Sequence, residues 1–207
     1  TTPSPSLSGL VGSEMCIRDR STDLENTIAI GFGALCDASN QARIGNSSVT
    51  SIGGYADWSN VSDARFKTNI KENTPGLNFI NKLRPVTYNM DMDAIARFKK
   101  TPDNLRDTEA EAKKAQILQT GFIAQEVEQA ARELGFDFSG VDAPKNSNDS
   151  YGLRYATFVV PLVKGMQEQQ AIIDKQEIEI KYQTETMKAQ EERIKALEEK
   201  LNRLLND

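Results

Sequence analysis

The feature that most constrains this sequence is a seven-residue repeat that runs without interruption from Val159 almost to the last residue. Two positions of each heptad, spaced three residues apart, form the expected core. The first is Val159, Met166, Ile173, Ile180, Met187, Ile194 and Leu201, and the second is Leu162, Gln169, Gln176, Gln183, Gln190, Leu197 and Leu204. A pattern sustained over seven heptads is typical of a coiled coil and disfavours an isolated surface helix. We therefore predict a long helical coiled coil over residues 159–207.

The second core position also carries information about specificity. Four of its seven residues are glutamines, and each buried amide needs a partner at the same level of the coil. Such residues lower stability but restrict the register of the helices. The periodicity alone does not distinguish two strands from three, because β-branched residues at the first core position also suit dimers.

Composition excludes several classes of function. The 207 residues carry a net charge of −5 and contain no histidine, so a Ser-His triad, a Cys-His dyad and a histidine metal site are ruled out. The two cysteines, Cys16 and Cys36, lack the spacing of metal ligands. The negative charge gives no reason to expect nucleic acid as a partner, and no apolar run is long enough to predict a membrane span. We expect neither cofactor nor metal, and lysine is the strongest candidate for a general base.

Residues 1–20 are set apart from the remainder. They look like translated sequencing-adapter read-through rather than native protein, so we exclude them from reasoning about the fold. A secretory signal is the competing interpretation, but the segment lacks a basic start and its apolar part is interrupted by Gly9, Gly12 and Glu14. We expect the natural amino terminus to be missing.

Residues 21–61 are rich in glycine and small polar residues and predict short strands joined by tight turns. An Ile-Gly step recurs at Ile30-Gly31, Ile44-Gly45 and Ile52-Gly53. The stretch from Asn26 to Leu35 resembles a head repeat of trimeric surface adhesins and phage fibres, which implies a β-prism or β-roll shared by three chains. An isolated glycine-rich loop is the alternative.

Residues 62–158 predict a mixed α+β domain. Thr74-Pro75 is expected to open a helix that carries Leu77, Ile80 and Leu83, and Pro85 is expected to end it before a strand at Val86-Thr87-Tyr88.

The second half of this domain is expected to be mainly helical. The charged region from Asp91 to Gln119 predicts a solvated helical hairpin with a break near Thr101-Pro102. A helix within Gly121 to Leu134 is expected to be amphipathic, and a strand within Tyr151 to Tyr155 completes the domain. The apolar face of this helix comprises Ile123, Val127, Ala130, Ala131 and Leu134.

Ser62 and Lys67 are the candidate catalytic pair. A serine hydroxyl becomes a strong nucleophile only when a base takes its proton, and lysine is a base only in its neutral form. Residues five apart lie on different faces of a helix and on opposite faces of a strand. The two side chains can therefore meet only across an irregular turn or between chains, and a serine cap beside a solvated lysine is the simpler interpretation.

Several short motifs, in order, resemble the carboxy-terminal intramolecular chaperone domain of phage tail fibres and tailspikes, the S74 peptidase family. They are Ser62-Asp63, Arg65, Lys67 and Ile70; Leu83, Pro85 and Tyr88; Gly121-Phe122-Ile123-Ala124-Gln125-Glu126-Val127; and Tyr155 followed by Pro161-Leu162-Val163 and Gln167-Glu168. These motifs span about half of the chain. The charged insertion from Asn89 to Gln119 and the long coil after Glu168 depart from the compact pattern expected of the family.

The resemblance implies a specific function. Three chains would assemble through the domain, the preceding fibre or tailspike would fold, and each chain would then cleave itself once at Val61-Ser62. Ser62 would be the nucleophile and Lys67 the base of this serine endopeptidase. Asp63 and Arg65 would orient the turn or form a simple surface pair, and Gln125 and Glu126 would support the site or serve only in helix packing and solvation. The partners implied are further copies of the chain and its own upstream fibre.

Two alternatives remain open at this stage. A non-cleaving trimerisation cap or stalk of a phage fibre or bacterial adhesin would use the same fold without hydrolysis. A release domain of the kind found in membrane-bound transcription factors would need a transmembrane segment and a DNA-binding domain. The expected location is a virion tail fibre made in the cytoplasm of a bacterial host, or alternatively a bacterial cell surface.

Overall fold

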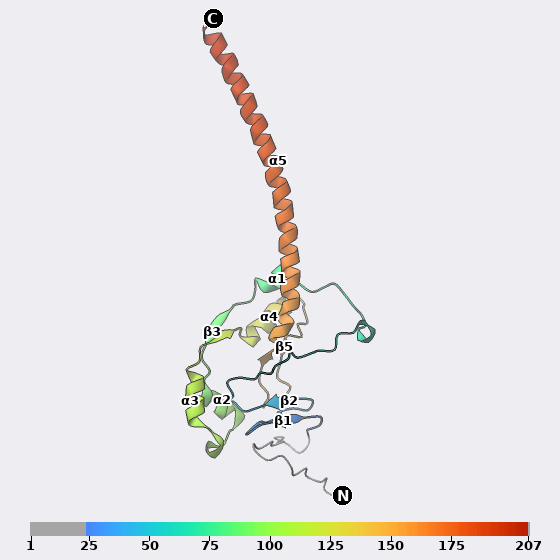
Figure 1. The fold of residues 1–207 in the computed structure, drawn as a ribbon, viewed down its shortest axis with the longest axis vertical. Coiled ribbons are helices and arrows are strands. Elements are labelled where there is room, and N and C mark those ends of the chain that lie inside the picture. Colours follow the sequence, from blue (N-terminus) through green and yellow to red (C-terminus); the bar gives the residue numbers. More distant parts are fainter. Residues whose placement is uncertain (1–23, 207) are drawn as a thin grey trace. The chain divides into compact units, whose positions relative to one another are not determined.

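A computed structural model describes residues 24–206 (Figure 1), so the predictions for residues 1–20 and for Cys16 lie outside the described residues. The chain divides into two compact units. The first comprises the described residues up to Ile70 together with Leu83–Gln129 and Phe138–Arg154. The second comprises Lys71–Lys82, Ala130–Asp137 and the chain from Tyr155 onward. The mixed α and β composition agrees with the sequence prediction.

The first unit begins with a small parallel β-coil, residues 24–49. Strands β1 (Ile28–Ile30) and β2 (Ala42–Ile44) pair in parallel, and each residue of β1 lies beside the residue fourteen positions later. The turns repeat with the same offset, because Asn26 and Asn40 both have a positive φ and the side-chain amide of Asn26 donates to that of Asn40 over 2.9 Å. The segment therefore completes one turn of a coil with a pitch of fourteen residues.

The inside of the β-coil is built from small side chains. Ala29, Ala34 and Cys36 are buried together and Leu24 packs against them, whereas Ile28 on the neighbouring face is 54% exposed. The Ile-Gly steps at positions 30–31 and 44–45 stack, and both glycines adopt the positive φ that a side chain would strain. The third step, Ile52-Gly53, does not continue the coil. It follows the second by eight residues instead of fourteen and lies in an irregular, exposed segment.

The charged region forms two helices as predicted. Helices α2 (Met92–Lys99) and α3 (Thr108–Ala115) are separated by a short 3-10 turn, Asp103–Leu105, and the chain breaks at the predicted proline. Asp91 and Asp107 cap the two helices through their carboxylates, which accept the backbone N–H groups of Ala94 and Ala110. The predicted hairpin is solvated only in part. Its buried residues are Met92, Ala96 and Glu111.

Two further strand pairs complete the first unit. Strand β3 (Val86–Tyr88) occurs where predicted and pairs in antiparallel fashion with β4 (Gln119–Gly121). Strand β4 lies between two regions whose composition predicts helix. Strands β5 (Val141–Asp142) and β6 (Gly152–Leu153) form a short antiparallel pair. Helix α4 (Ala124–Glu133) contributes residues to both units and buries Val127, Ala130 and Ala131 of the predicted apolar face. The two end residues of that face lie outside the helix, and Ile123 is 40% exposed while Leu134 is half-buried.

The second unit is organised around the contact between α1 (Leu77–Ile80) and the start of α5 (Val159–Asn206). Gly76 lies so close to α5 that a Cβ there would meet the backbone nitrogen of Gly165 at 2.6 Å. Glu168 accepts the N–H of Leu77 over 2.8 Å and so caps α1 from another helix. Helix α1 is shorter than predicted and Leu83 lies beyond its end.

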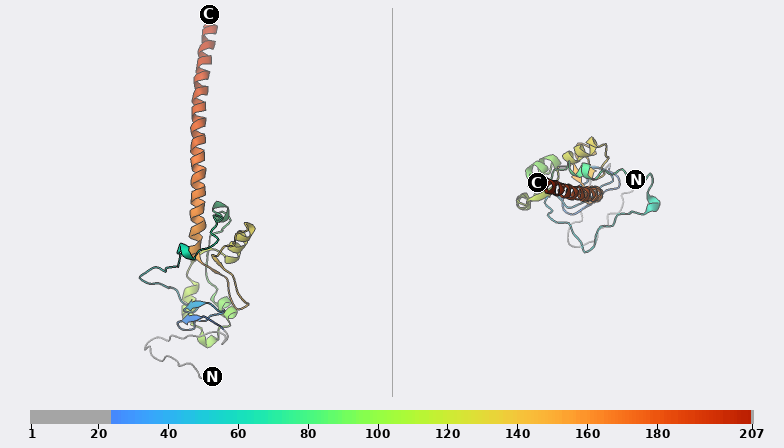
Figure 2. Two further views of the ribbon diagram at one scale, coloured as in Figure 1. Left: turned by 90° about the vertical axis from the view of Figure 1, so that its right-hand side faces the viewer. Right: turned by 90° about the horizontal axis from the view of Figure 1, so that it is seen from above.

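Helix α5 is continuous over 48 residues, as Figures 1 and 2 show from two directions. The predicted helix is thus confirmed from its first heptad. The residues of its first core position are between 38% and 72% exposed in this single chain. No helix within residues 24–206 is both long and apolar enough to span a bilayer.

Candidate functional site

The candidate site is a tight turn that brings Ser62 and Lys67 together. The ammonium nitrogen of Lys67, Nζ, lies 2.8 Å from Oγ of Ser62. Between them the chain forms a 3-10 turn at Ala64–Phe66, in which Lys67 donates its backbone N–H to the carbonyl of Ala64. Residues five apart would lie on different faces of a helix or a strand, and this turn instead brings the two side chains together.

Asp63 fixes this turn from its first position. Its carboxylate accepts the backbone N–H of Arg65 over 2.9 Å and also binds the Arg65 guanidinium, whose terminal nitrogen lies 2.6 Å from the second oxygen. Hydrogen bonding to Arg65 lowers the pKa of Asp63, and the same pair raises the pKa of Arg65. Arg65 is exposed and Asp63 is still 35% exposed, so the pair contributes little to stability. Its effect is to hold the backbone that positions Ser62 and Lys67.

The surroundings of the turn are unusually open. Ser62 and Lys67 are both exposed, and so is nearly every residue from 51 to 70. This segment nevertheless carries large apolar side chains. More than 60% of the surface of each is exposed: Ile52, Tyr55, Trp58, Val61, Phe66 and Ile70. The single chain therefore brings Ser62 and Lys67 together but leaves the apolar residues around them uncovered.

Gln125 and Glu126 lie in the first turn of α4. Glu126 forms a two-point ion pair with Arg84, with distances of 2.5 and 3.1 Å, and this hydrogen bonding lowers the pKa of the Glu126 carboxyl. Gln125 is exposed. Among residues 24–206, no hydrogen bond joins either side chain to Ser62 or Lys67.

Arg84 was not among the residues selected from the sequence. It immediately precedes Pro85, and its partner lies forty-two positions later. An arginine on a charged surface usually has no specific role, so the residue type alone did not mark Arg84 as part of an ion pair. The one hint in the sequence is that Arg84 stands next to Pro85, which belongs to one of the motifs.

The comparison with protein families identifies one domain. Residues 62–136 match the family model Peptidase_S74, described as chaperone of endosialidase. The chain thus carries a domain of this family, and the resemblance seen in the sequence is confirmed over this stretch. The match begins at Ser62, the first residue of the turn, and Tyr155 and the Pro161-Leu162-Val163 motif lie beyond its end. Neither the curated proteins nor the solved structures contain a match to this chain.

Proposed function

We propose that the chain is an intramolecular chaperone that assembles as a homotrimer, templates the folding of the fibre segment preceding Ser62, and then cleaves the Val61-Ser62 bond. The observation that carries the proposal is the 2.8 Å contact between Lys67 Nζ and Ser62 Oγ at the first residue of the family match. A chaperone role follows from the family description, and the self-cleavage is our inference from the geometry.

The cleavage proceeds in two steps in which every atom is accounted for. Oγ of Ser62 attacks the carbonyl carbon of Val61 while Lys67 takes the hydroxyl proton, and this proton then passes to the departing amide nitrogen of Ser62. The C–N bond breaks and an ester joins Val61 to the serine side chain. Water then opens the ester: one of its protons returns to Oγ, and the acid formed on Val61 ionises to a carboxylate and gives its proton to the new amine of Ser62.

The energetic requirement is modest because each chain reacts once. One cleavage per quarter of an hour corresponds to a barrier of about 21 kcal/mol. The nucleophile and the scissile carbonyl belong to adjacent residues, and such intramolecular placement can supply several kcal/mol of the reduction in the barrier. A dyad without histidine is sufficient for a reaction of this kind.

Assembly of further copies accounts for two exposed apolar surfaces of this chain. One is the row of core positions along α5, and the other is the segment from residue 51 to 70. Burial of a lysine in an apolar environment favours its neutral form, which is the form that can act as a base. A neighbouring copy that covered the turn would thus make cleavage depend on assembly.

The template role rests on the topology of the β-coil. Its strands pair across fourteen residues, and contacts between copies would be separated still further, so the structure nucleates slowly. A coiled coil over α5 would hold three copies in register and raise the effective concentration of each partner strand. We place the assembled protein in a virion tail fibre.

The first experiment is intact mass spectrometry of freshly expressed protein, with amino-terminal sequencing of any fragment. We expect the wild type to yield a fragment that begins at Ser62, and Ser62→Ala and Lys67→Ala to remain whole. Lys71→Ala is the matched control, because Lys71 is an exposed lysine four residues further along the chain. An intact wild-type trimer, or a Lys67→Ala variant that still cleaves, would refute the proposed dyad.

A second candidate function is a structural cap that trimerises a phage fibre or bacterial surface adhesin without cleavage. The 48-residue length of α5 favours it, because such a long helix is more readily understood as a permanent stalk than as a discarded segment. An intact wild-type trimer in the mass experiment is the result that this function predicts.

A further inference from the structure

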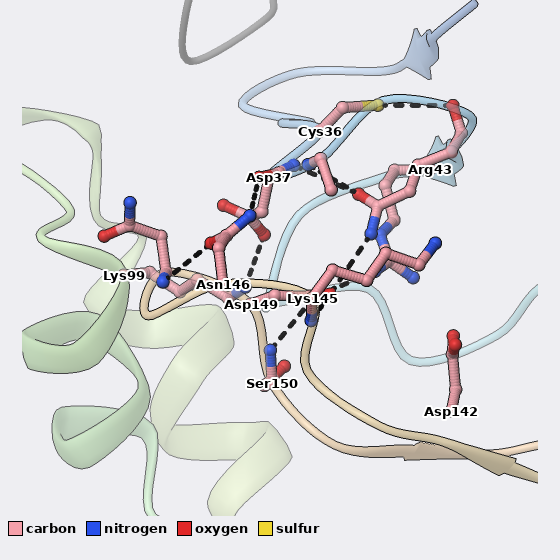
Figure 3. A network of polar contacts seen from close by, with 12 residues as sticks. Cys36, Asp37, Arg43, Lys99, Asp142, Lys145, Asn146, Asp149 and Ser150 are labelled. Carbon is pink, nitrogen blue, oxygen red and sulfur yellow. Dashed lines mark hydrogen bonds and ion pairs between the residues drawn. The ribbon is translucent and has the colours of Figure 1, made fainter. Parts of the chain in front are cut away.

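A buried polar network joins the β-coil to parts of the first unit that come much later in the sequence (Figure 3). Its carboxylates belong to Asp37, which follows β1, and to Asp149, which lies in the loop between β5 and β6. Both residues are less than 9% exposed, as is Gln41 of the β-coil. Buried charged groups are costly unless they are paired, so their partners show what this network is built to hold.

Asp37 is held from two directions. Its side chain forms an ion pair with Lys99 at the end of α2, with Nζ 2.5 Å from the carboxylate and only 3% of the Asp37 side chain exposed. Its backbone carbonyl accepts the side-chain amide of Asn146 over 2.9 Å. One residue of the β-coil is therefore bound both by α2 and by the loop between β5 and β6.

Asp149 provides the reciprocal contact. Its carboxylate lies 3.6 Å from the guanidinium of Arg43 and accepts the amide of Gln41 over 3.5 Å, and both of these residues belong to the β-coil. The backbone N–H groups of Lys145 and Ser150 also donate to it, at 3.2 and 2.9 Å, and thereby fix its orientation. The loop thus presents a preorganised carboxylate to the β-coil.

Lys114 of α3 makes a third contact. Its ammonium group donates to the backbone carbonyls of Ser47 and Val49, at 2.7 and 2.6 Å. Burial lowers the pKa of Lys114, as expected for an ammonium that has left bulk water for these carbonyls. Because it binds main-chain atoms, this contact depends on how the backbone is folded and not on which side chains it carries.

The contacts that hold the β-coil all join residues on opposite sides of the Val61-Ser62 bond. Every contacted residue of the β-coil lies between positions 37 and 49, before the Val61-Ser62 bond, and every residue that holds it lies after that bond. The two sets are connected by the exposed, irregular stretch from residue 50 to 61. Cutting within this stretch removes a covalent link and leaves all of the contacts in place.

We propose that helices α2 and α3 and residues 145–150 form a polar clamp that binds the folded β-coil and retains it after the connecting chain is cut. The charged insertion, which departs from the compact pattern expected of the family, supplies Lys99 and Lys114 and thus forms half of the clamp. The consequence for release rests on the proposed self-cleavage, whereas the clamp itself does not. Cleavage separates the two fragments covalently, and dissociation of the clamp is a second, distinct step.

The clamp is selective for the folded state of the β-coil. Asp37, Gln41 and the two carbonyls reach their partners only when β1 and β2 are paired and the chain turns at Gly45. A misfolded coil would leave Lys99 and Asp149 partly desolvated without their partners, which is unfavourable. The domain would therefore bind the correct product of folding in preference to an unfolded segment.

The test separates the clamp from the self-cleavage. A full-length Ser62→Ala protein carries a recognition sequence for a specific protease in place of residues 54–60, all of which are exposed. After complete digestion, we expect the amino-terminal fragment to co-elute with the remainder in size-exclusion chromatography. A Lys99→Met/Lys114→Met variant should release the fragment at least tenfold faster. Lys113→Met is the matched control, because Lys113 lies beside Lys114 but is 72% exposed and pairs with Glu109 of its own helix.

Two results would overturn the clamp. One is immediate loss of the fragment from the digested Ser62→Ala protein, and the other is equal retention by the double variant and the control. Hydrogen exchange of the uncut proteins guards against misfolding. In the double variant we expect faster exchange over residues 28–49 and unchanged protection of α4. Faster exchange in α4 as well would mean that the two lysines support the whole unit, and this result would also contradict the proposal. Failure of self-cleavage in the wild type leaves this result unchanged.

Discussion

Replacing Ile180 with alanine is the sharpest test of assembly through α5. Ile180 occupies the first core position of the fourth heptad and is 61% exposed in the single chain. Alanine has a higher helix propensity than isoleucine, so the substitution does not weaken the helix itself. Any loss of assembly would therefore report the loss of a buried side chain between copies.

The expected loss of trimer stability follows from the part of the Ile180 side chain that assembly would bury. Full burial of an isoleucine contributes about 1.5–3 kcal/mol, and burial of the 61% now exposed would contribute about 1–2 kcal/mol per chain. A homotrimer contains the residue three times, which gives roughly 3–5 kcal/mol per trimer. The constant for trimer formation should fall roughly a hundredfold to several thousandfold.

Sedimentation equilibrium over a series of protein concentrations measures this constant directly. Glu185→Ala is the control, because position 185 lies five residues further along α5 and outside both core positions of the heptad. We expect the control to assemble as the wild type does. Circular dichroism should show the same helix content in all three proteins at concentrations at which they are assembled.

The reasoning would be refuted if Ile180→Ala and Glu185→Ala assembled equally well. It would also be refuted if the wild type were a monomer at every concentration measured. In either case the exposed core positions of α5 would not form a coiled coil, and the template mechanism would lose its physical basis.

Three further predictions concern the domain itself. Phe79→Ala should lower the free energy of unfolding in urea by about 3–5 kcal/mol, because this side chain is fully buried. Gly76→Ala should lower the free energy of unfolding by about 1–3 kcal/mol in the same assay, because the methyl group of the alanine would collide with the backbone nitrogen of Gly165. Glu126 should titrate by NMR below its ordinary pKa, and Arg84→Met should restore the ordinary value, since hydrogen bonding to Arg84 favours the charged carboxylate. The small stabilisation from this pair should therefore be present near neutral pH and lost as the pH falls through the lowered pKa.

Each of these predictions has a clear contrary result. Ordinary surface substitutions change the free energy of unfolding by no more than about 0.5 kcal/mol. A change this small in Phe79→Ala or Gly76→Ala would contradict the described packing. An unchanged titration of Glu126 in Arg84→Met would show that another group lowers its pKa.

The elements that could be predicted from the sequence are those with a strong local cause. The heptads predicted α5 from its first residue, and Pro102 marked the break between α2 and α3. The apolar spacing of α4 predicted the three residues that it buries, but not that Ile123 is exposed. The requirement for an irregular turn between Ser62 and Lys67 also followed from geometry, and the 3-10 turn meets it.

The elements that could not be predicted depend on distant partners. Strand β4 is three residues long and is defined by its pairing with β3, since Gln119-Thr120-Gly121 has no marked strand propensity. Helix α1 receives its amino-terminal cap from Glu168, ninety-one positions away from Leu77. The contacts of Lys99 and Lys114 with the β-coil were missed for the same reason, because a lysine on a charged helix is usually solvated.

The fourteen-residue pitch of the β-coil also restricts how residues 24–49 can change in length. An insertion of fourteen residues would add one complete turn and leave every following side chain on its present face. An insertion of thirteen would shift the pairing with the added strand by one residue. Side chains inside the coil, such as Ala29, would then lie beside positions that face outward, as Ile28 does, since neighbouring residues of a strand point to opposite faces. Proteins that contain such a coil should thus differ in the length of this segment by whole turns, which favours duplication of complete fourteen-residue units.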